Sequence, residues 1–346
     1  MRSVAVIEPG RVEIVDVPPP VPGPYQVRVR TEVACLCNAT DGKLVAGHFP
    51  GVDKYPLLLG HESVGIVDTV GDKVRGFKLG DRVVGGLVFD VGDSRYASGW
   101  GGFCEYTLAN DHDAMVADGV ADAAHGWFEC YEIQRPVAAD IPVEEAVLLA
   151  TCREVYGGFG DFHLQPGDEV LIFGAGPVGL SFATFGRQWR LGYIGVVDPL
   201  AVKREKALGM GADAVFAPDS PELAQLTQDR GKPLDVVIDA VGSPAIVNAA
   251  LPLIRMGGAI GVYGVISDPS MTLDKGRGPY NFNLYVHQWP TRARERAAQE
   301  PLCQWIREGK LRASDFLTHE FPVERIADAL AEVKTGRAIK VLLRYY

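Results

Sequence analysis

A glycine-rich turn between an apolar run and a helical stretch limits the folds open to this chain more than any other part of its sequence. The apolar run, Glu169-Val170-Leu171-Ile172-Phe173, suits a strand buried on both faces. The turn is Gly174-Ala175-Gly176-Pro177-Val178-Gly179, and Leu180 to Gln188 after it have helical composition. Glycines permit a tight turn and close approach of the backbone to a bound group, while a helix amino terminus offers unpaired N–H groups to an anion. This order predicts the first unit of a doubly wound, parallel sheet.

Asp198 gives this turn its specificity. It ends the apolar run Ile194 to Val197, about 20 residues after Gly179, which is the spacing of the carboxylate that holds a ribose 2'-hydroxyl in dinucleotide-binding proteins. A carboxylate repels a 2'-phosphate, so NAD is favoured over NADP. Lys203 either contacts the adenosine ribose or is a solvated surface residue. The predicted NAD-binding residues are Gly174, Gly176, Pro177, Val178, Gly179, Asp198 and Lys203. Taken alone, the glycines would also suit a plain strand-to-helix turn.

The 346 residues exceed what one hydrophobic core usually supports, so we expect two domains. Alternating stretches near the amino terminus, such as Gln26 to Val33, suit half-buried antiparallel strands. From Glu169 onward, apolar runs alternate with helical stretches, which is the α/β pattern of a parallel sheet. The further runs are Tyr193 to Val197, Ala214 to Phe216, Val236 to Ala240 and Ala259 to Tyr263. We expect a loop from Lys275 to Trp289, a helical stretch from Arg292 to Glu308 and a last strand near Ile339 to Leu343.

Composition narrows the classes of partner. The formal net charge of -10 disfavours a nucleic acid, because such binders need a basic surface. The amino terminus has no secretory signal, and no apolar run has the roughly 20 residues needed to cross a bilayer, so we expect no membrane partner. The six cysteines are too sparse for a disulfide framework, which fits a cytoplasmic protein in which they are core thiols or metal ligands.

A candidate metal site lies in the first part of the chain. Gly60-His61-Glu62 follows the apolar run Pro56 to Leu59 and precedes a strand, Ser63 to Val70, while Cys37 lies in the turn Cys35 to Asp41. Thiolate and imidazole suit tetrahedral zinc, and three protein ligands leave a fourth position for water or substrate. A zinc-bound alcohol is more acidic than a free one, which assists its oxidation. A lone His or Cys is nevertheless more often structural than a ligand.

Several motifs occur in one order along the chain. They are Cys37 before Thr40-Asp41; Gly60-His61-Glu62 with Gly65; Val70-Gly71 with Val74 and Phe77; Gly80-Asp81-Arg82-Val83; Gly101-Gly102-Phe103 with Glu105-Tyr106; Pro166-Gly167-Asp168; and the glycine turn. With these motifs the chain resembles the medium-chain, zinc-containing alcohol and polyol dehydrogenase family over nearly its whole length.

The resemblance implies an α/β protein with a GroES-like β-barrel catalytic domain and a doubly wound Rossmann domain. We expect the catalytic domain over residues 1–145, the NAD-binding domain over 146–290, and a segment over 291–346 that returns to the catalytic domain. Cys37 and His61 would be zinc ligands, Glu62 a ligand or a carboxylate beside the zinc, and Thr40 the hydroxyl that relays the proton of the alcohol. Relatives associate through the edge strand of the Rossmann sheet, here Ala259 to Tyr263, which implies a homodimer or homotetramer.

The chain departs from the family pattern at the relay and at the third ligand. Thr40 comes one residue later than the usual relay hydroxyl. The histidine that often ends the relay is missing at the expected offset, where Lys43 is nearer than His48. Counting back from Tyr156 puts Leu149, which cannot bind metal, at the third ligand position. Cys152 lies about one helical turn further on and is the predicted third ligand, against the alternative that it is a core thiol. If it is a core thiol, Glu62 completes the site.

Two further departures concern the segments around the catalytic domain. The four cysteines of the family's structural zinc lobe are absent from Leu87 to Trp100, so we expect one catalytic zinc and no structural zinc. Asp111 to Pro136 looks like an inserted lobe, whose His125, Glu129 and Cys130 either reach the active site or belong to a surface excursion.

We therefore expect zinc-assisted, NAD-dependent oxidation of a secondary alcohol to a ketone. Amides, phenols and an imidazole between Tyr280 and Trp289 favour a polyol, cyclitol or sugar as the hydroxylated small-molecule substrate. A zinc-free reductase of the same superfamily is one alternative, although that class lacks the pair Cys37 and His61. A non-catalytic dinucleotide-binding sensor is the other, which the displaced relay and the missing third ligand favour.

Overall fold

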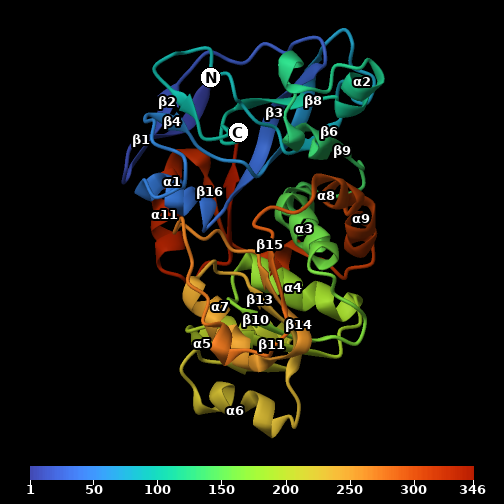
Figure 1. Ribbon diagram of the computed structural model, residues 1–346. Helices are drawn as coiled ribbons and strands as arrows, with labels where there is room; N and C mark the ends of the chain where they lie inside the picture. The colour runs from blue at the N-terminus through green and yellow to red at the C-terminus, as the bar shows by residue number, and fades with distance from the viewer. The chain divides into compact units, whose positions relative to one another are not determined.

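The computed structural model describes residues 1–346 and divides into two compact units. The first contains Met1–Arg153 and Gln299–Tyr346, and the second contains Glu154–Ala298. Each unit has its own sheets and its own core, and the two are described here one at a time (Figure 1).

The first unit is built mainly from strands. They are β1 (Arg2–Glu8), β2 (Arg11–Asp16), β3 (Gln26–Leu36), β4 (Leu57–Leu58), β5 (Ser63–Val70), β6 (Arg82–Val84), β7 (Ala97–Ser98), β8 (Tyr106–Asn110), β9 (Arg135–Val137), β16 (Leu317–Pro322) and β17 (Lys340–Arg344). One sheet has the order β2-β1-β4-β7, and a second has the order β16-β17-β3-β5-β6-β9 with β8 also paired to β3.

The long strand β3 organises this unit. Its buried residues Val27, Val29, Thr31 and Val33 alternate with more exposed ones, as the sequence predicts for a half-buried strand. At Gly65 on β5, an added Cβ would lie 2.2 Å from the main-chain oxygen of Arg30, so only glycine allows these two strands to pair so closely. Because β17 pairs with the other side of β3, the end of the chain belongs to the same sheet.

The helices of the first unit are short apart from one. They are α1 (Thr40–Ala46), α2 (His112–Ala117), α3 (Val143–Asp161), α9 (Gln299–Arg307), α10 (Ala313–Phe316) and α11 (Ile326–Lys334), with 3-10 turns η1 (Ala123–His125), η2 (Glu129–Ile133) and η5 (Val323–Arg325). The amino-terminal part of the first unit ends at Arg153 within α3, and the rest of that helix belongs to the second unit.

The second unit is the doubly wound part of this α/β protein. Its strands are β10 (Glu169–Phe173), β11 (Tyr193–Val197), β12 (Ala214–Phe216), β13 (Leu234–Asp239), β14 (Ile254–Val262) and β15 (Asn283–Val286). They form one parallel sheet in the order β12-β11-β10-β13-β14-β15, so the strand order reverses between β10 and β13. The doubly wound parallel sheet predicted from the sequence is confirmed.

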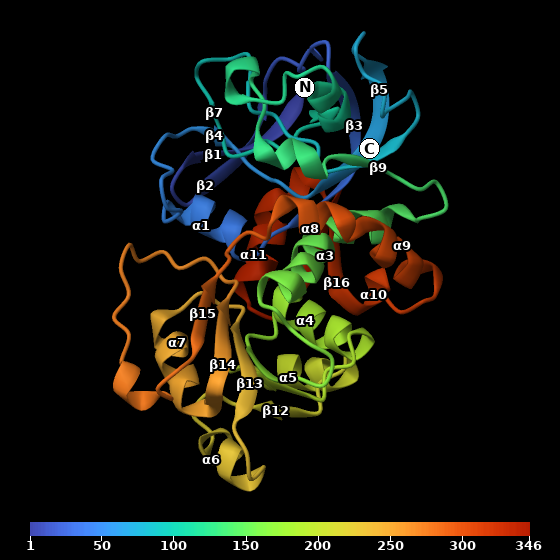
Figure 2. The same cartoon turned by 45° about the vertical axis from the view of Figure 1, so that its right-hand side comes forward.

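Helices cover both faces of this sheet (Figure 2). The helices of the unit are α4 (Pro177–Gln188), α5 (Ala201–Gly209), α6 (Pro221–Asp229), α7 (Pro244–Ala250) and α8 (Arg292–Ala297), of which α8 lies against α3, with 3-10 turns η3 (Leu251–Leu253) and η4 (Lys275–Arg277). Because both faces are covered, the strands carry buried runs such as Val170 to Ile172 instead of alternating residues.

Two predictions about this unit were wrong in detail. The expected loop Lys275 to Trp289 contains η4 and the strand β15. Consequently β14, which includes most of Ala259 to Tyr263, is not the edge of the sheet, because β15 pairs with its outer side.

The inserted segment from Asp111 to Pro136 folds as α2, η1 and η2 and leads into β9. The buried carboxylate of Asp111 caps α2 by accepting a hydrogen bond from the Ala114 N–H, and it also accepts from the N–H groups of Arg75 and Gly76. Asp118 adds an ion pair with the Arg75 guanidinium, so the segment is fixed to the loop that precedes β6.

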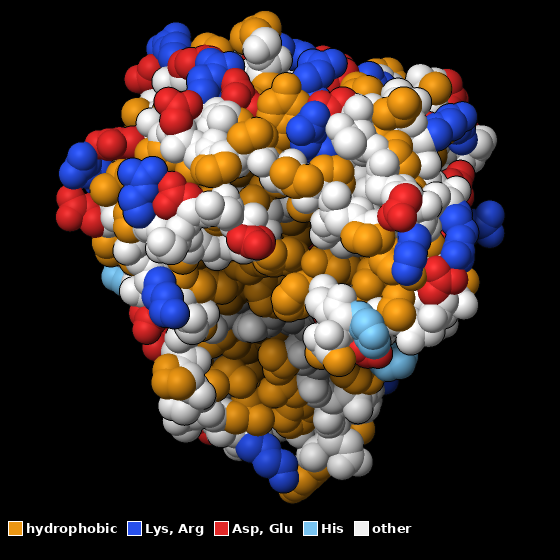
Figure 3. Space-filling view, turned by 90° about the horizontal axis from the view of Figure 1, so that it is seen from above, with side chains coloured by type: hydrophobic (Ala, Val, Ile, Leu, Met, Phe, Trp, Pro, Cys, Tyr) orange, Lys and Arg blue, Asp and Glu red, His pale blue; other side chains and the backbone are white.

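No helix of the chain has both the length and the apolar character needed to span a bilayer. On the face shown in Figure 3, basic and acidic side chains are interspersed, and no broad basic field of the kind that binds polyanions is seen there.

Candidate active site

Three side chains with metal-binding atoms meet in the first unit. They are Cys37, which follows β3, and His61 and Glu62, which precede β5. Their ligand atoms all lie within 4.8 Å of one another. The pairing of β3 with β5 explains the meeting, because Ala34 lies opposite Ser63 and so brings the end of one strand beside the start of the other.

Asp41 sets the orientation of the His61 ring. The Nδ1 atom of His61 lies 3.5 Å from Asp41 Oδ1, whereas its Nε2 atom lies 3.9 Å from Glu62 Oε1. Asp41 is itself held in place, because its other carboxylate oxygen accepts a hydrogen bond of 2.8 Å from the Cys37 N–H. Nε2 is thus the ring atom that faces the other candidate ligands.

Charge around His61 favours a cation. Burial lowers the pKa of His61, but the carboxylate of Asp41 and the thiol of Cys37 raise it more, so the pKa lies well above its usual value. A metal ion at Nε2 and a proton there compete for the same lone pair, and metal binding would release the proton.

Glu62 is held by two partners that come from distant parts of the chain. Its Oε1 atom accepts a hydrogen bond of 3.0 Å from the Thr151 hydroxyl on α3. Its Oε2 atom forms a buried ion pair with the ammonium of Lys340 at the start of β17. Burial lowers the pKa of Lys340, but Glu62 and the thiols of Cys35 and Cys37 together raise it more, so the ammonium stays charged. The direction of the Glu62 carboxylate is therefore fixed at both oxygens.

This donor set fits a zinc ion. A thiol, an imidazole and a carboxylate are ligands that zinc accepts, and three of them leave a fourth position open. His61 Nδ1 and Asp41 Oδ1 face each other and are buried, and neither atom has a hydrogen-bond partner. In metal sites, a carboxylate beside the outer nitrogen of a ligating histidine commonly orients the histidine ring, and Asp41 stands in that position.

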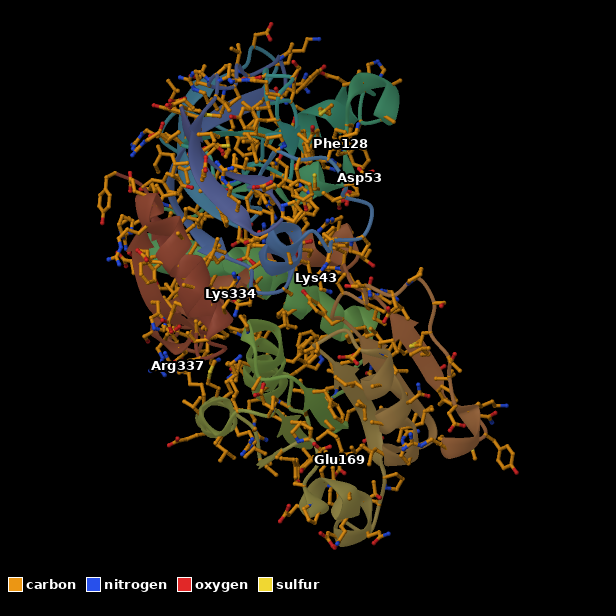
Figure 4. The ribbon with its side chains drawn as sticks, turned by 90° about the vertical axis from the view of Figure 1, so that its left-hand side faces the viewer. Lys43, Asp53, Phe128, Glu169, Lys334 and Arg337 are labelled. Atoms are coloured by element: carbon orange, nitrogen blue, oxygen red, sulfur yellow. The ribbon has the colours of Figure 1, made fainter.

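The remaining predicted catalytic residues lie near this group but outside it. Thr40 is buried and begins α1, three residues after Cys37. Lys43, labelled in Figure 4, lies one helical turn further along, and burial lowers its pKa more than the nearby Cys37 thiol raises it. Cys152 is buried on α3 and is not one of the three grouped side chains. Its role as a ligand stays a prediction.

Residues of the insertion do not join the metal group either. His125 is paired with Asp122 of its own turn, at 2.8 Å, and its side chain is half exposed. Glu129 and Cys130 lie on η2, and Phe128 just before them is half exposed (Figure 4).

The glycine turn of the second unit has the shape that a pyrophosphate requires. Gly174 has a φ of 101°, and an added Cβ at Gly179 would lie 1.8 Å from its main-chain oxygen. Gly176 is the N-cap of α4 and Pro177 is its first residue, with Val178 next. A Cβ at Gly176 would meet no atom within 4 Å, so open space lies there beside the helix amino terminus.

Asp198 closes the other side of this turn. It is buried at the end of β11, where its carboxylate accepts hydrogen bonds from the N–H groups of Ala175, at 2.8 Å, and Leu200, at 2.9 Å. Lys203 is half-buried on the first turn of α5. Because each carboxylate oxygen has a second lone pair, Asp198 can still accept a bond from a ribose hydroxyl. The turn and the carboxylate together fit a dinucleotide.

Sequence reasoning assigned no role to four residues that shape these sites: Asp41, Thr151, Lys340 and Arg204. The guanidinium of Arg204 donates hydrogen bonds to the main-chain oxygens of Asp198, at 2.7 Å, and Pro199, at 2.9 Å. Only Asp41 had a local signal, since it stands in the Cys37 turn. The others contact residues far away in sequence or lie on a helix surface.

Two family models match the chain. The alcohol dehydrogenase GroES-like domain matches residues 23–118, and the zinc-binding dehydrogenase model matches residues 210–341. The chain belongs to the medium-chain alcohol dehydrogenase family. Curated proteins similar to it include starvation-sensing protein RspB of Escherichia coli, which is 28% identical over 100% of this chain and 99% of the relative. Sorbitol dehydrogenase of Halalkalibacterium halodurans is 25% identical, with 96% of each chain covered.

Solved structures agree on the fold of this medium-chain dehydrogenase. The crystal structure of an alcohol dehydrogenase, rspB of E. coli CFT073, complexed with NADH has a TM-score of 0.81 at 23% identity. The match covers 100% of this chain and 99% of the rspB chain. The alcohol dehydrogenase TADH of Thermus sp. ATN1 has a TM-score of 0.78 at 23% identity, with 99% of each chain covered.

Proposed function

We propose that this protein is a zinc-assisted, NAD-dependent dehydrogenase that oxidises a secondary alcohol of a polyol, cyclitol or sugar to a ketone, reversibly. The observation that supports this most is the meeting of Cys37, His61 and Glu62, because that donor set is the one a catalytic zinc takes. The proposal includes one zinc per chain and no structural zinc.

The residues of the chain have distinct tasks in this reaction. When bound, zinc lowers the pKa of an alcohol and polarises a carbonyl, and NAD accepts the hydride. Cys37, His61 and Glu62 would hold the metal, and Asp41 keeps Nε2 of His61 directed at it. Thr40, three residues after Cys37, is the hydroxyl proposed to relay the alcohol proton, passing its own proton on towards water as it receives that of the alcohol. Cys152 is the other candidate for the third protein ligand, and in that case Glu62 would lie beside the metal.

The cofactor is proposed as NAD instead of NADP. The carboxylate of Asp198 is buried and fixed by two N–H groups, so it cannot turn away from a 2'-phosphate. The pyrophosphate would rest on the turn Gly174–Gly179, and Lys203 would contact the adenosine ribose.

The direct test is NAD reduction by zinc-loaded protein with sorbitol, myo-inositol, D-glucose and 2-butanol. We expect reduction with at least one hydroxylated substrate, loss of the activity after treatment with a chelator, and its return with zinc. Chelator-insensitive activity in protein that binds no zinc would support a zinc-free reductase instead.

A non-catalytic sensor is the second candidate function. One relative of this chain is named a starvation-sensing protein, and no ligand-type residue stands where the family's third ligand is expected. A sensor would bind NAD with unchanged affinity in the Cys37→Ser variant and would be silent with every substrate of the panel when zinc is present.

Association into a homodimer or homotetramer belongs to the same proposal. The outer side of β15 is a sheet edge, where Val286 is 52% exposed, and a second copy of the strand could pair there. Light scattering on the Val286→Lys variant tests this, with a smaller particle as the expected result. A cytoplasmic location remains part of the proposal.

A further inference from the structure

Trp100 has a backbone conformation that is unusual for its size. Its φ is 70°, in the left-handed region that bulky residues avoid because the side chain is strained there. Such a conformation persists only where neighbouring contacts impose it.

Main-chain hydrogen bonds impose it here. Gly99 N–H donates to the Leu58 oxygen at 2.7 Å, and Gly102 N–H donates to the Gly60 oxygen at 2.6 Å, so the segment around Trp100 runs along the residues that lead to His61. An added Cβ at Gly102 would lie 2.9 Å from the main-chain nitrogen of His61, which shows how closely the two segments approach. The position of Trp100 is therefore fixed relative to the metal group.

The indole ring lies directly beside the candidate ligand. Its centroid is 5.7 Å from the His61 ring, with an interplanar angle of 62°, and 5.5 Å from the Phe49 ring, with an angle of 84°. Phe49 supports the indole by an edge contact from a second side. Trp100 is only half-buried, so part of its ring is open to solvent next to the metal group.

The free part of this side chain has two kinds of binding surface. The ring is a flat apolar face, and its N–H group has no hydrogen-bond partner within the protein. A six-membered ring that carries several hydroxyls is complementary to both, because its C–H groups form an apolar face and its hydroxyl oxygens form a polar rim. An open-chain polyol has no fixed flat face to offer.

We propose that Trp100 determines substrate specificity and selects a ring alcohol, such as a cyclitol or a pyranose, over an open-chain one. This rests on the proposed function and narrows its substrate class. Trp100 is a positioning residue in this proposal: it holds the ring of the substrate beside His61 and takes no part in proton or hydride transfer.

The test compares Trp100→Ala, Trp100→Phe and Trp127→Phe with the unaltered protein, all loaded with zinc. Trp127 is the matched control because it lies in the insertion, where its N–H donates to His112. The substrates are myo-inositol and D-galactose as polyhydroxylated rings, cyclohexanol as a ring without further hydroxyls, and sorbitol and 2-butanol as open chains.

We expect Trp100→Ala to lower kcat/KM for the hydroxylated rings about tenfold, mainly through KM, and to leave the open-chain alcohols within about threefold. Trp100→Phe keeps a flat face without the N–H group, so kcat/KM for cyclohexanol should be unchanged. For the hydroxylated rings, kcat/KM of this variant should lie between the values of Trp100→Ala and the unaltered protein. An equal loss for rings and open chains, or a preference of the unaltered protein for sorbitol over the rings, overturns the proposal.

Calorimetric binding of the same alcohols in the presence of NAD separates this inference from the proposed function. Binding of ring alcohols that depends on Trp100, without any turnover, would retain the inference and refute the dehydrogenase activity. Oxidation that does not depend on Trp100 would retain the dehydrogenase activity and overturn the inference. Absence of binding and turnover for every ring alcohol would also overturn the inference, and the dehydrogenase activity would be refuted only if the open-chain alcohols were not oxidised either.

Discussion

The ammonium of Lys340 and the carboxylate of Glu62 form an ion pair in which both side chains are almost completely buried, with 2% and 6% of their surface exposed. Thr151 holds the other oxygen of the same carboxylate. Because Glu62 is one of the three grouped side chains with metal-binding atoms, the closing strand β17 supports the candidate metal site directly.

Removal of one partner from this pair should be costly. Lys340→Met leaves the charge of Glu62 buried without its counterion, and we expect the free energy of unfolding to fall by about 3 kcal/mol. Lys334→Met, an exposed position on α11 labelled in Figure 4, is the control and should change it by less than about 0.5 kcal/mol. Urea unfolding of the two variants checks this, and equal stability would show that the pair contributes nothing.

The metal site makes a sharper prediction about two cysteines. The grouping of side chains favours Cys37 as a ligand and leaves Cys152 outside. We expect Cys37→Ser to lose zinc on dialysis against a weak chelator and Cys152→Ala to retain one zinc per chain. Metal analysis decides the matter, since loss of zinc from Cys152→Ala would support Cys152 as the third ligand that the sequence predicts.

The two sites differ in how much of them the sequence predicts. The glycine turn and Asp198 belong to a strand-turn-helix unit, in which every requirement is local: an apolar run, glycines where a Cβ would collide, and a carboxylate one strand later. The bounds of β10, β11 and β12 follow from such runs because buried parallel strands have few polar residues.

Contacts between distant residues have no such signal. Lys340 and Glu62 are 278 positions apart, and nothing around either residue indicates the other. The sequence predicts a loop where strand β15 lies, because its short apolar run Leu284 to Val286 stands between polar residues and remains exposed or half-buried at the edge of the sheet. The position of Trp100 beside His61 likewise depends on main-chain hydrogen bonds that Gly99 and Gly102 donate to the residues before His61.

The glycine turn allows stability and cofactor binding to be tested separately. Gly179→Ala puts a Cβ against the Gly174 oxygen, and we expect a loss of about 3 kcal/mol in unfolding free energy. Gly176→Ala meets no protein atom, so its stability should change by no more than about 1 kcal/mol. Its affinity for NAD should nevertheless fall at least about tenfold, because the new methyl group occupies the approach to the turn. Unfolding and NAD titration of both variants check this, and unchanged NAD affinity in Gly176→Ala would place the pyrophosphate elsewhere.

Arg204 bears on the choice of cofactor once Asp198 is changed. Its guanidinium is anchored to the main-chain oxygens of Asp198 and Pro199 and has no carboxylate partner. We expect Asp198→Ser to bind NADP at least about tenfold more tightly than the unaltered protein does, because the repulsion is gone and a fixed cation remains. Adding Arg204→Gln should cancel that gain, whereas Arg204→Gln alone should leave NAD affinity within about threefold. Titration with both nucleotides tests this, and a gain that survives the second substitution would exclude Arg204.

Acid stability of the second unit should depend on Glu169, which is labelled in Figure 4 and forms ion pairs with Arg230, at 2.6 Å, and Lys232, at 2.7 Å. Burial raises the pKa of Glu169, but the two cations lower it more, so it lies below the ordinary value of 4.5. A carboxyl group whose pKa is depressed by folding stabilises the protein fully above the unfolded pKa and loses that contribution as the pH falls through the folded one. Glu169→Gln should therefore be less stable by about 1 kcal/mol at pH 7, and the difference should shrink below about pH 4.5. Glu205→Gln, at an exposed position on α5, is the control, and a difference between Glu169→Gln and the unaltered protein that stays constant down to pH 3 would mean that the ion pairs are not its source.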